Sequence, residues 1–544
     1  MPAKIFDIFH QLSRDHNESK TQAVARSTRR GKSAKAFISQ PMPKGVGSAH
    51  IGLQLNAGNY LIDGQLIKEP DEFIWDVEYE NAPFQEKAHG FLWLDDLVAN
   101  GSHACLSKAR LWFLEWVERF GDGYNSAWTP ELAGGRVIRM VNHAIVLLGN
   151  SKELDAKHYF ETISHHARFL KKRNQFAPDG LPKFRALAGY IYSALALEEF
   201  ASDLEPAMRA LAKECEAYVA QDGGIPTRNP EELLEIFMLL VWIEQGMTSA
   251  SFHPDRALLD AIERMAPAIR SLRIGDGRLV AFQGANSVAS AVVAQVLSDA
   301  GTRSKTTQAR VMGFARASAK ETILVMDVGG GVSDSASVLA FEVSAGDQHI
   351  FQSTGFCHSL ASSSYSVAAI EGAKLEASRM QVFPMTELQP NAGAATLGAV
   401  HAGYQEVYGL RYSRKLELDK NGRILFGSDS FKCMTDKDKA VFDKMTTGHE
   451  GKMLGYALHF HVAPDVDVEL DLGGTAVSLK LPNGDVWIFK ASFGILALKD
   501  STYFEPDRIK PRATKQIVVS SEVVNYEGAV TWMLTRLVQE RTYS

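Results

Sequence analysis

Four arginines in the first half of the chain could bind acidic groups. Each falls near the expected start or inner face of a helix; they are Arg136, Arg139, Arg185 and Arg228. A guanidinium group is planar and permanently charged, so it can hold a carboxylate or a sulfate through two parallel hydrogen bonds. The four residues therefore suggest a basic groove for an acidic ligand. Salt bridges on helix surfaces are the alternative interpretation.

Other residues in the same half could also contact a ligand. Asn142-His143 joins an amide to an imidazole, which together could neutralise a carboxylate and accept a proton; a structural place in a helix is the alternative. Trp128 begins a Trp-Thr-Pro-Glu sequence outside a helix, so it is the tryptophan best suited to stack on a sugar ring, with core packing as the alternative. Adjacent His165 and His166 point about 100° apart on a helix, which disfavours a shared metal ion.

Two further pairs carry weaker signals. His459 and His461 are two residues apart in an expected strand and share one face, which suits either a metal ion or structural hydrogen bonds. Glu131 and Asp222 could serve as the paired carboxylates of a hydrolase, an option ranked last because the sequence does not give their separation. We expect no cofactor and no tightly bound metal.

Composition narrows the class of protein. The chain has 544 residues, enough for two or more domains, and 45% hydrophobic with 22% charged residues is ordinary for a soluble globular protein. A net charge of -6 disfavours a nucleic-acid partner. The four cysteines form no Cys-x-x-Cys pair, which disfavours a zinc site or a disulfide framework. No apolar run suits a signal peptide or a membrane span, so we expect a cytoplasmic protein.

The beginning of the chain has two different patterns. Residues 17–47 are polar and basic with no visible hydrophobic period, and they contain Arg26, Arg29, Arg30, Lys32 and Lys35. A mobile arm and a surface that attracts anions are both consistent with this composition. Residues 49–80 alternate apolar and polar positions, which predicts a short β segment.

The elements that would position these residues change in kind near residue 310. Before it, apolar residues recur with the helical period between turn signals such as Pro178-Asp179-Gly180. After it, the period falls to two, and Asn421-Gly422 and Asn483-Gly484 are typical of hairpin turns. Helices are expected at 104–119, 131–149, 155–173, 181–200, 206–220, 231–245, 255–271 and 286–300. Strands are expected at 322–327, 338–343, 348–353, 364–370, 408–418, 456–462, 466–480, 486–490 and 515–520.

Several sequence blocks, in order along residues 84–535, resemble the bacterial heparinase II/III family of polysaccharide-lyase-like proteins. They are His89-Gly90-Phe91-Leu92-Trp93-Leu94, Trp128-Thr129-Pro130-Glu131 with Arg136, Asp179-Gly180-Leu181-Pro182 with Arg185, Asp222-Gly223-Gly224 with Arg228-Asn229-Pro230, Leu339-Ala340-Phe341-Glu342-Val343-Ser344 and Phe460-His461-Val462-Ala463-Pro464-Asp465-Val466. The resemblance implies an α+β multidomain fold, an incomplete α/α toroid followed by an antiparallel β-sandwich. The domains would then be residues 1–83, an N-terminal arm with a short β segment; 84–310, the toroid; and 311–544, the sandwich.

The resemblance also implies cleavage of uronic-acid polysaccharides by β-elimination. That reaction needs a group that neutralises the uronate carboxylate, a base for the C5 proton and an acid for the leaving oxygen. The Asn-His pair and the tyrosine usual in the family are absent from the matching stretches. The usual His-x-Asp reads Ser335-Ala336-Ser337, and Tyr365 stands near the place of a further histidine. Serine is a poor zinc ligand, so the usual metal site is not expected.

Two hypotheses follow from these residues. In the first, the chain is a divergent lyase for an acidic polysaccharide or oligosaccharide. Its catalytic candidates are Tyr365, His143 and Arg228, and its substrate-binding candidates are Arg136, Arg185, Asn229 and Trp128. We expect Tyr365 and at least two of Arg136, Arg185 and Arg228 to line one groove. In the second, the chain is an inactive relative that binds acidic glycans.

Overall fold

The computed structural model divides the chain into two compact units. It describes residues 17–39, 44, 46–62, 65–78, 82–149, 153–302, 304, 306–332, 337–355, 364–370, 372–373, 380–384, 394–447, 453–506 and 508–537. The first unit, called the helical unit here, comprises Met1–Val219, Glu235–Ile262 and Asp507–Ile509; the second, the sheet unit, comprises Ala220–Leu234, Glu263–Pro506 and Lys510–Ser544. The domain boundaries expected at residues 83 and 310 stay predictions.

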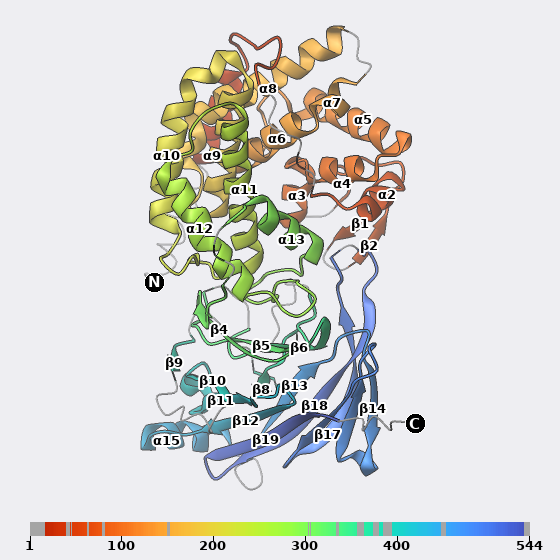
Figure 1. Cartoon of the computed structure of the whole chain (residues 1–544), viewed down its shortest axis with the longest axis vertical. Helices are drawn as coiled ribbons and strands as arrows, with labels where there is room; N and C mark the ends of the chain where they lie inside the picture. The colour runs from red at the N-terminus through yellow and green to blue at the C-terminus, as the bar shows by residue number, and fades with distance from the viewer. Residues whose placement is uncertain are drawn as a thin grey trace. The chain divides into compact units, whose positions relative to one another are not determined.

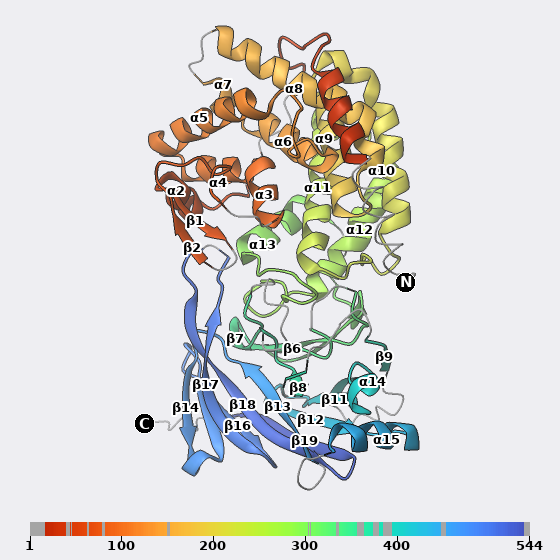
Figure 2. The ribbon, with the colours of Figure 1, turned by 180° about the vertical axis from the view of Figure 1, so that it is seen from behind.

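Serial helices joined by short loops build the helical unit, as the 3.6-residue period predicted. In both views α8, α9 and α10 lie side by side (Figures 1 and 2). The elements are α2 (Ala49–Asn56), β1 (Asn59–Ile62), β2 (Gln65–Lys68), α3 (Ala82–His89), α4 (Leu92–Asn100), α5 (His103–Phe120), α6 (Pro130–Asn142), α7 (Ala144–Leu148), α8 (Glu153–Arg173), α9 (Leu181–Ala196) and α10 (Leu204–Tyr218). The two units share α11 (Pro230–Ser249) and α12 (Arg256–Ser271).

Helices α6 and α9 touch through their backbones. A Cβ atom on Gly134 would lie 2.2 Å from the carbonyl oxygen of Arg185, and one on Gly189 would lie 2.4 Å from the Cα of Gly134. Such distances leave no room for any side chain at either position. The contact therefore sets how Arg139 of α6 and Arg185 of α9 are spaced.

The helix expected at 131–149 is interrupted at His143. Its backbone, with φ -107° and ψ 21°, leaves the helical region and separates α6 from α7. Thr129 caps the start of α6 by accepting a hydrogen bond from Leu132 N, and Pro130 follows it at the first helical position. The break aims the His143 ring at a carboxylate of α4.

The sheet unit contains two antiparallel sheets. One runs β3–β4–β5–β6–β7, and the other is twelve-stranded, with the long strands β17, β18 and β19 curling together (Figure 1). The elements are α13 (Ser290–Asp299), β3 (Arg310–Val311), β4 (Phe314–Ala319), β5 (Thr322–Asp327), β6 (Phe341–Ala345), β7 (Gln348–Phe351), β8 (Ala368–Ile370), β9 (Val382–Pro384), β10 (Ala395–His401), α14 (Gln405–Tyr408), β11 (Arg411–Leu418), β12 (Ile424–Lys432), α15 (Asp436–Met445), β13 (Met453–His461), β14 (Asp467–Asp471), β15 (Ala476–Lys480), β16 (Val486–Ala491), β17 (Ile495–Tyr503), β18 (Arg512–Val524) and β19 (Glu527–Arg536).

Aromatic side chains fill the space between the two sheets. Phe341 of β6 stacks on Trp532 of β19 with ring centroids 5.6 Å apart, and Phe351 of β7 packs on Phe460 of β13 at 5.5 Å. This face-to-face core makes the sheet unit a sandwich. The α+β fold class expected from the sequence, helices followed by an antiparallel sandwich, is confirmed. Both predicted Asn-Gly turns join neighbouring strands, at β11–β12 and β15–β16.

Two local predictions were wrong. Residues 17–28 form a helix. The sequence did not predict it, because the buried side of this helix consists of the small residues Thr21, Ala25 and Thr28 and shows no hydrophobic period. The predicted β segment at 49–80 begins with α2, which Ser48 caps, and only then forms the β1–β2 hairpin. The sheet unit also contains α15, whose reciprocal capping box between Thr435 and Asp438 is a signal that the sequence carries.

Candidate functional site

Asp95 of α4 organises a group of charged side chains in the helical unit. Arg139 Nε donates a hydrogen bond to Asp95 Oδ2 at 2.7 Å, and His143 Nε2 lies 2.7 Å from Asp95 Oδ1. Burial acts to raise the pKa of Asp95, but Arg139 and His143 outweigh it and hold that pKa below its ordinary value. Asp95 is therefore an anion that orients both an arginine and a histidine.

A second ion pair completes this group. Arg185 of α9 donates from Nε and Nη2 to the two carboxylate oxygens of Glu235 on α11, at 2.6 and 2.8 Å. Burial acts to raise the pKa of Glu235, but Arg185 and then Arg139 lower it overall. The influence of Arg139 couples the two pairs, so we call Asp95, Arg139, His143, Arg185 and Glu235 the toroid charge cluster.

The toroid charge cluster brings together two of the four arginines singled out in the sequence. It is not a free basic surface, since Asp95 and Glu235 match the formal charges of Arg139 and Arg185. The side chains of Arg185 and Glu235 are 19% and 26% exposed. An acidic ligand can reach this pair from solvent, but it must compete with Glu235 for the guanidinium.

Arg136 lies in a closed aromatic cage, contrary to the expected substrate-binding role. Its side chain is 0% exposed and donates to His166 Nε2 at 2.8 Å, to His89 O at 2.8 Å and to Ala127 O at 2.9 Å. Its guanidinium carbon lies 4.3 Å from the ring centroid of Trp116. Burial lowers the pKa of Arg136 to about 9. Arg136 Nε thus donates to the His166 side chain, and Nη1 donates to two backbone carbonyls of the protein.

Trp128 forms another wall of this cage and offers no face to a sugar. It is 1% exposed, its ring centroid lies 4.5 Å from that of His166, and its indole N–H donates to Phe120 O at 2.6 Å. The core-packing alternative therefore holds for Trp128. His166 Nδ1 lies 2.8 Å from Thr162 O, so Nδ1 carries the proton and Nε2 is free to accept from Arg136.

Arg228 and Asn229 hold the backbone of the sheet unit. Arg228 donates to Asp327, to Gly330 O and, at 2.8 Å, to Met312 O, and little of it is exposed. Asn229 Oδ1 accepts from the backbone N–H groups of residues 231 and 232 at the start of α11, at 2.9 and 3.1 Å. These contacts are those of a buried anchor and a helix cap, and the roles expected for both residues stay predictions.

Tyr365 is buried in the sheet unit. It is 3% exposed and its ring lies 6.5 Å from that of Phe282. The three arginines expected beside Tyr365 in a groove all have partners within the protein. Arg136 and Arg228 donate to protein groups, and Arg185 belongs to the toroid charge cluster. The groove expected to be lined by Tyr365 and at least two of these arginines therefore stays a prediction.

The metal site implied by the family resemblance is not matched by the residues that the structure describes. Ser335 and Ala336 lie outside the described residues, and Ser337 Oγ donates to Asp327 Oδ2 at 3.0 Å. His461 Nδ1 lies 2.9 Å from Ser501 Oγ, and His459 Nδ1 lies 3.0 Å from Gln516 Oε1. Among the described side chains, no three of the His, Cys, Asp or Glu type group as they would around a metal ion.

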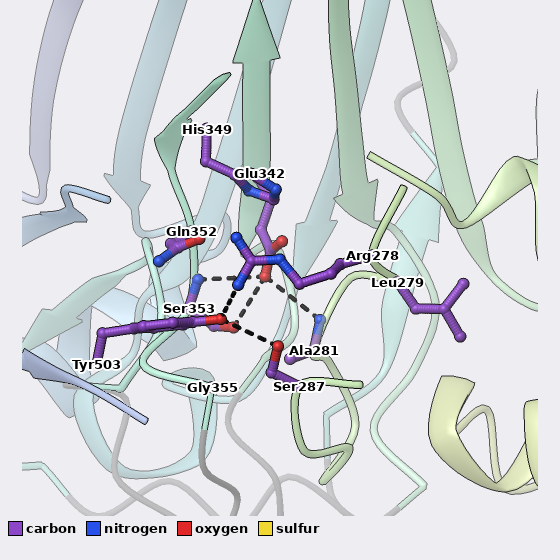
Figure 3. Close-up of a pocket in the computed structure, with 10 residues that line it drawn as sticks. All are labelled: Arg278, Leu279, Ala281, Ser287, Glu342, His349, Gln352, Ser353, Gly355 and Tyr503. Atoms are coloured by element: carbon purple, nitrogen blue, oxygen red, sulfur yellow. Dashed lines mark hydrogen bonds between the residues drawn. The ribbon is translucent and has the colours of Figure 1, made fainter. Parts of the chain in front are cut away.

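The sheet unit contains a polar pocket that the sequence did not predict (Figure 3). Arg278 donates a hydrogen bond to the Tyr503 hydroxyl, which also lies 3.0 Å from Ser287 Oγ. Burial raises the pKa of Tyr503, and Arg278 opposes this rise without cancelling it. Tyr503 is therefore protonated at neutral pH. Arg278 and Tyr503 are 225 positions apart, so no local motif marks the pair.

A buried carboxyl group forms the other side of this pocket. Glu342 Oε1 accepts from Ser353 Oγ at 2.8 Å, from Ser353 N at 3.2 Å and from Ala281 N at 3.3 Å, and burial raises the pKa of Glu342. The free volume is about 10 Å³, which is room for roughly one water molecule. This volume is too small for a sugar ring. Glu342 belongs to a family-like block, and that block was the available signal.

Known proteins share both the sandwich and the whole fold. Residues 362–533 match the model of the family described as heparinase II/III-like, C-terminal. A heparinase III crystal structure matches with a TM-score of 0.66 at 9% identity, covering 97% of this chain and 91% of that one. A mutant heparan sulfate lyase from Pedobacter heparinus matches with a TM-score of 0.55 at 11% identity, covering 97% and 90%. At these identities the likeness establishes the fold.

A relative in sequence carries a different kind of name. FtsZ-localized protein C of Caulobacter vibrioides is 27% identical to this chain over 538 residues, covering 91% of the chain and 89% of that protein. The similarity therefore runs through the helices as well as the sandwich. In the part of the chain that the structure describes, no helix combines the length and apolar character needed to cross a membrane.

Proposed function

We propose that this heparinase II/III-like protein binds an acidic glycan and has little or no lyase activity. The observation that carries the proposal is the engagement of the expected catalytic groups. His143 pairs with Asp95, Arg228 pairs with Asp327, and Tyr365 is buried. Groups held in this way are poorly placed to move protons on a polymer. The fold still belongs to proteins that act on polysaccharides, and this favours retained binding.

The name of the Caulobacter relative narrows the class of glycan. That name says that the relative localises with FtsZ, and we take this as a sign of action at the cell envelope. We therefore favour a carboxylate-bearing envelope glycan over an external uronate polymer. The sequence similarity over almost the whole chain supports the extension to this protein.

A second candidate function, a true lyase, rests on the Arg278–Tyr503 contact. In β-elimination a base removes the C5 proton, electrons move to form the C4–C5 double bond, and the leaving O4 takes a proton from an acid. Tyr503 is protonated and could supply that proton. The cation of Arg278 would stabilise the phenolate that remains. The small volume of the pocket is what speaks against this candidate.

One panel separates the two candidates. Peptidoglycan sacculi, alginate, hyaluronan, heparan sulfate and pectate would be tested for retention of the protein and for the ultraviolet absorbance of an unsaturated uronate. We expect retention on at least one acidic glycan, weaker at high salt, without a gain in absorbance. An absorbance gain that Tyr503→Phe reduces at least about a hundredfold would establish the lyase, because one acid–base group contributes about that much. Tyr124→Phe, an exposed tyrosine, is the control.

Substitutions in the toroid charge cluster should change binding in opposite directions. We expect Arg185→Gln to weaken glycan retention about tenfold, since one charge-assisted hydrogen bond contributes roughly 1.5–3 kcal/mol. Glu235→Gln should strengthen retention, because it removes the carboxylate that competes for Arg185. The measurement is dissociation constants at two salt concentrations.

The matched control for charge is Arg209→Gln. Arg209 pairs with Glu205 on the surface of α10 and lies outside the toroid charge cluster. Equal losses with Arg185→Gln and Arg209→Gln would mean that only net charge matters. Weaker binding with Glu235→Gln would show that the cluster does not hold the acidic ligand.

A further inference from the structure

A large crevice in the helical unit lies apart from the toroid charge cluster. Its walls are the turn that follows the first helix, the helix α5 and the helix α8. Its volume is about 920 Å³, within the size range of sites that bind small molecules. The lining residues that matter below are Arg29, Arg30, Glu118, Glu161, Leu114 and Val117.

Arg168 of α8 fixes the shape of the turn. Its guanidinium donates to three backbone carbonyls of the turn, Thr28 O at 2.7 Å, Lys32 O at 2.6 Å and Arg29 O at 3.1 Å. Gly31 has φ +152°, and a Cβ atom there would lie 2.9 Å from Arg168 Cδ. Arg168 therefore fixes the conformation of the turn, and Arg29 and Arg30 of this turn line the crevice. This order contradicts the mobile-arm interpretation for these residues.

The turn belongs to a strongly basic stretch of an otherwise acidic chain. Residues 17–39 contain six Lys or Arg and one Glu, a net charge of +5, whereas the whole chain has -6. Lys32 lies 3.7 Å from Glu199, but in the described part of the chain no carboxylate is recorded as an ion-pair partner of Arg29 or Arg30. Two adjacent, exposed guanidinium groups at one opening provide the charge and the donors that a doubly charged anion requires.

The remaining walls carry two carboxylates, an apolar surface and the side chains of His158 and His165. Glu118 and Glu161 are exposed carboxylates, and Glu161 lies 3.8 Å from Lys157 on the same helix. Leu114 is 42% exposed, and together with Val117 it forms an apolar surface on α5. Carboxylates accept hydrogen bonds from sugar hydroxyls, and an apolar surface suits the C–H face of a sugar ring. The crevice thus combines an anion-binding end with a polyol-binding wall.

We propose that this crevice binds a phosphorylated sugar. Arg29 and Arg30 hold the phosphate, Glu118 and Glu161 accept from the hydroxyls, and Leu114 with Val117 contact the ring. A phosphate suits the site better than a carboxylate because it has three terminal oxygens and a charge near -2, enough for both arginines. The site is independent of the acidic-glycan proposal, since it shares no residue with the toroid charge cluster.

The test uses glucose 6-phosphate with the full chain, by calorimetry and by phosphorus NMR. We expect binding that Arg29→Ala and Arg30→Ala each weaken at least about tenfold, as the loss of a charge-assisted hydrogen bond implies. Lys20→Ala and Lys35→Ala remove the same charge from the same basic stretch without touching the crevice lining, and should change affinity less than about twofold. Glu118→Gln should weaken glucose 6-phosphate but leave inorganic phosphate unchanged.

Three results would overturn the proposal. One is the absence of binding at millimolar glucose 6-phosphate by the folded protein. Another is equal weakening by Lys20→Ala and Arg30→Ala, which would reduce the effect to net charge. The third is adsorption to phosphatidic acid vesicles without binding of glucose 6-phosphate, which would assign the basic stretch to a lipid surface instead.

Discussion

Replacing Arg136 by alanine should destabilise the protein by about 3–5 kcal/mol, the cost of breaking a buried charged network. The substitution leaves two backbone carbonyls and His166 Nε2 without their donor. It also opens a cavity against Trp116 and Trp128. The measurement is the free energy of unfolding in guanidinium chloride, followed by tryptophan fluorescence. Arg136→Met should cost less, about 1–3 kcal/mol, because methionine fills the cage and needs no desolvation of a charge.

The same variants decide between the structural and substrate-binding roles of Arg136. If the cage interpretation is correct, Arg136→Met retains acidic-glycan binding at a temperature where it is folded. Arg185→Gln is the comparison, since it should lose binding with a smaller loss of stability. Normal stability with abolished binding in Arg136→Met would restore the role expected from the sequence.

Acid should weaken the helical unit through two buried histidines. Burial, with a further contribution from Arg136, lowers the pKa of His89 to about 4; burial also lowers the pKa of His165 to about 4, from an ordinary 6.5. Between these values the unfolded chain takes up protons that the folded chain refuses. The stability that depends on these two histidines being neutral is therefore complete above pH 6.5 and is lost as the pH falls toward 4. At pH 5 each histidine lowers the free energy of unfolding by about 2 kcal/mol.

Variants isolate this contribution from other titrating groups. Burial raises the pKa of Asp96 to about 7, which acts in the opposite direction as the pH falls. The useful quantity is therefore the difference in unfolding free energy between the parent and His89→Gln/His165→Gln, measured at pH 7.5 and 5. We expect acid to cost the parent about 4 kcal/mol more than the double variant. Parallel pH profiles would show that these histidines are protonated in the folded state.

The fold was largely accessible from the sequence, because its elements carry periodic signals. The apolar stripe of α5 and the short apolar run of β5 each predicted the observed element closely. The first helix was missed since Thr21, Ala25 and Thr28 are small rather than hydrophobic. Burial of Ala25 depends on α8, which no local pattern records.

The site was less accessible, since burial and partners depend on distant residues. Sequence reasoning chose arginines and a histidine that are chemically capable, but it had no way to assign Asp95 to His143 or Glu235 to Arg185. Those partners decide that the toroid charge cluster has balanced charge. The pair of Arg278 and Tyr503 was missed for the same reason, as only folding brings them into contact.

The backbone contact of Gly134 with Gly189 has a consequence for ligand selection. Because the two helices already touch there, they cannot move closer to suit a ligand, and any larger residue would push them apart. The distance between Arg139 and Arg185 is therefore fixed. If the proposed acidic glycan binds here, acidic groups spaced by that distance would contact both arginines. Acidic groups with a different spacing would contact only one of them.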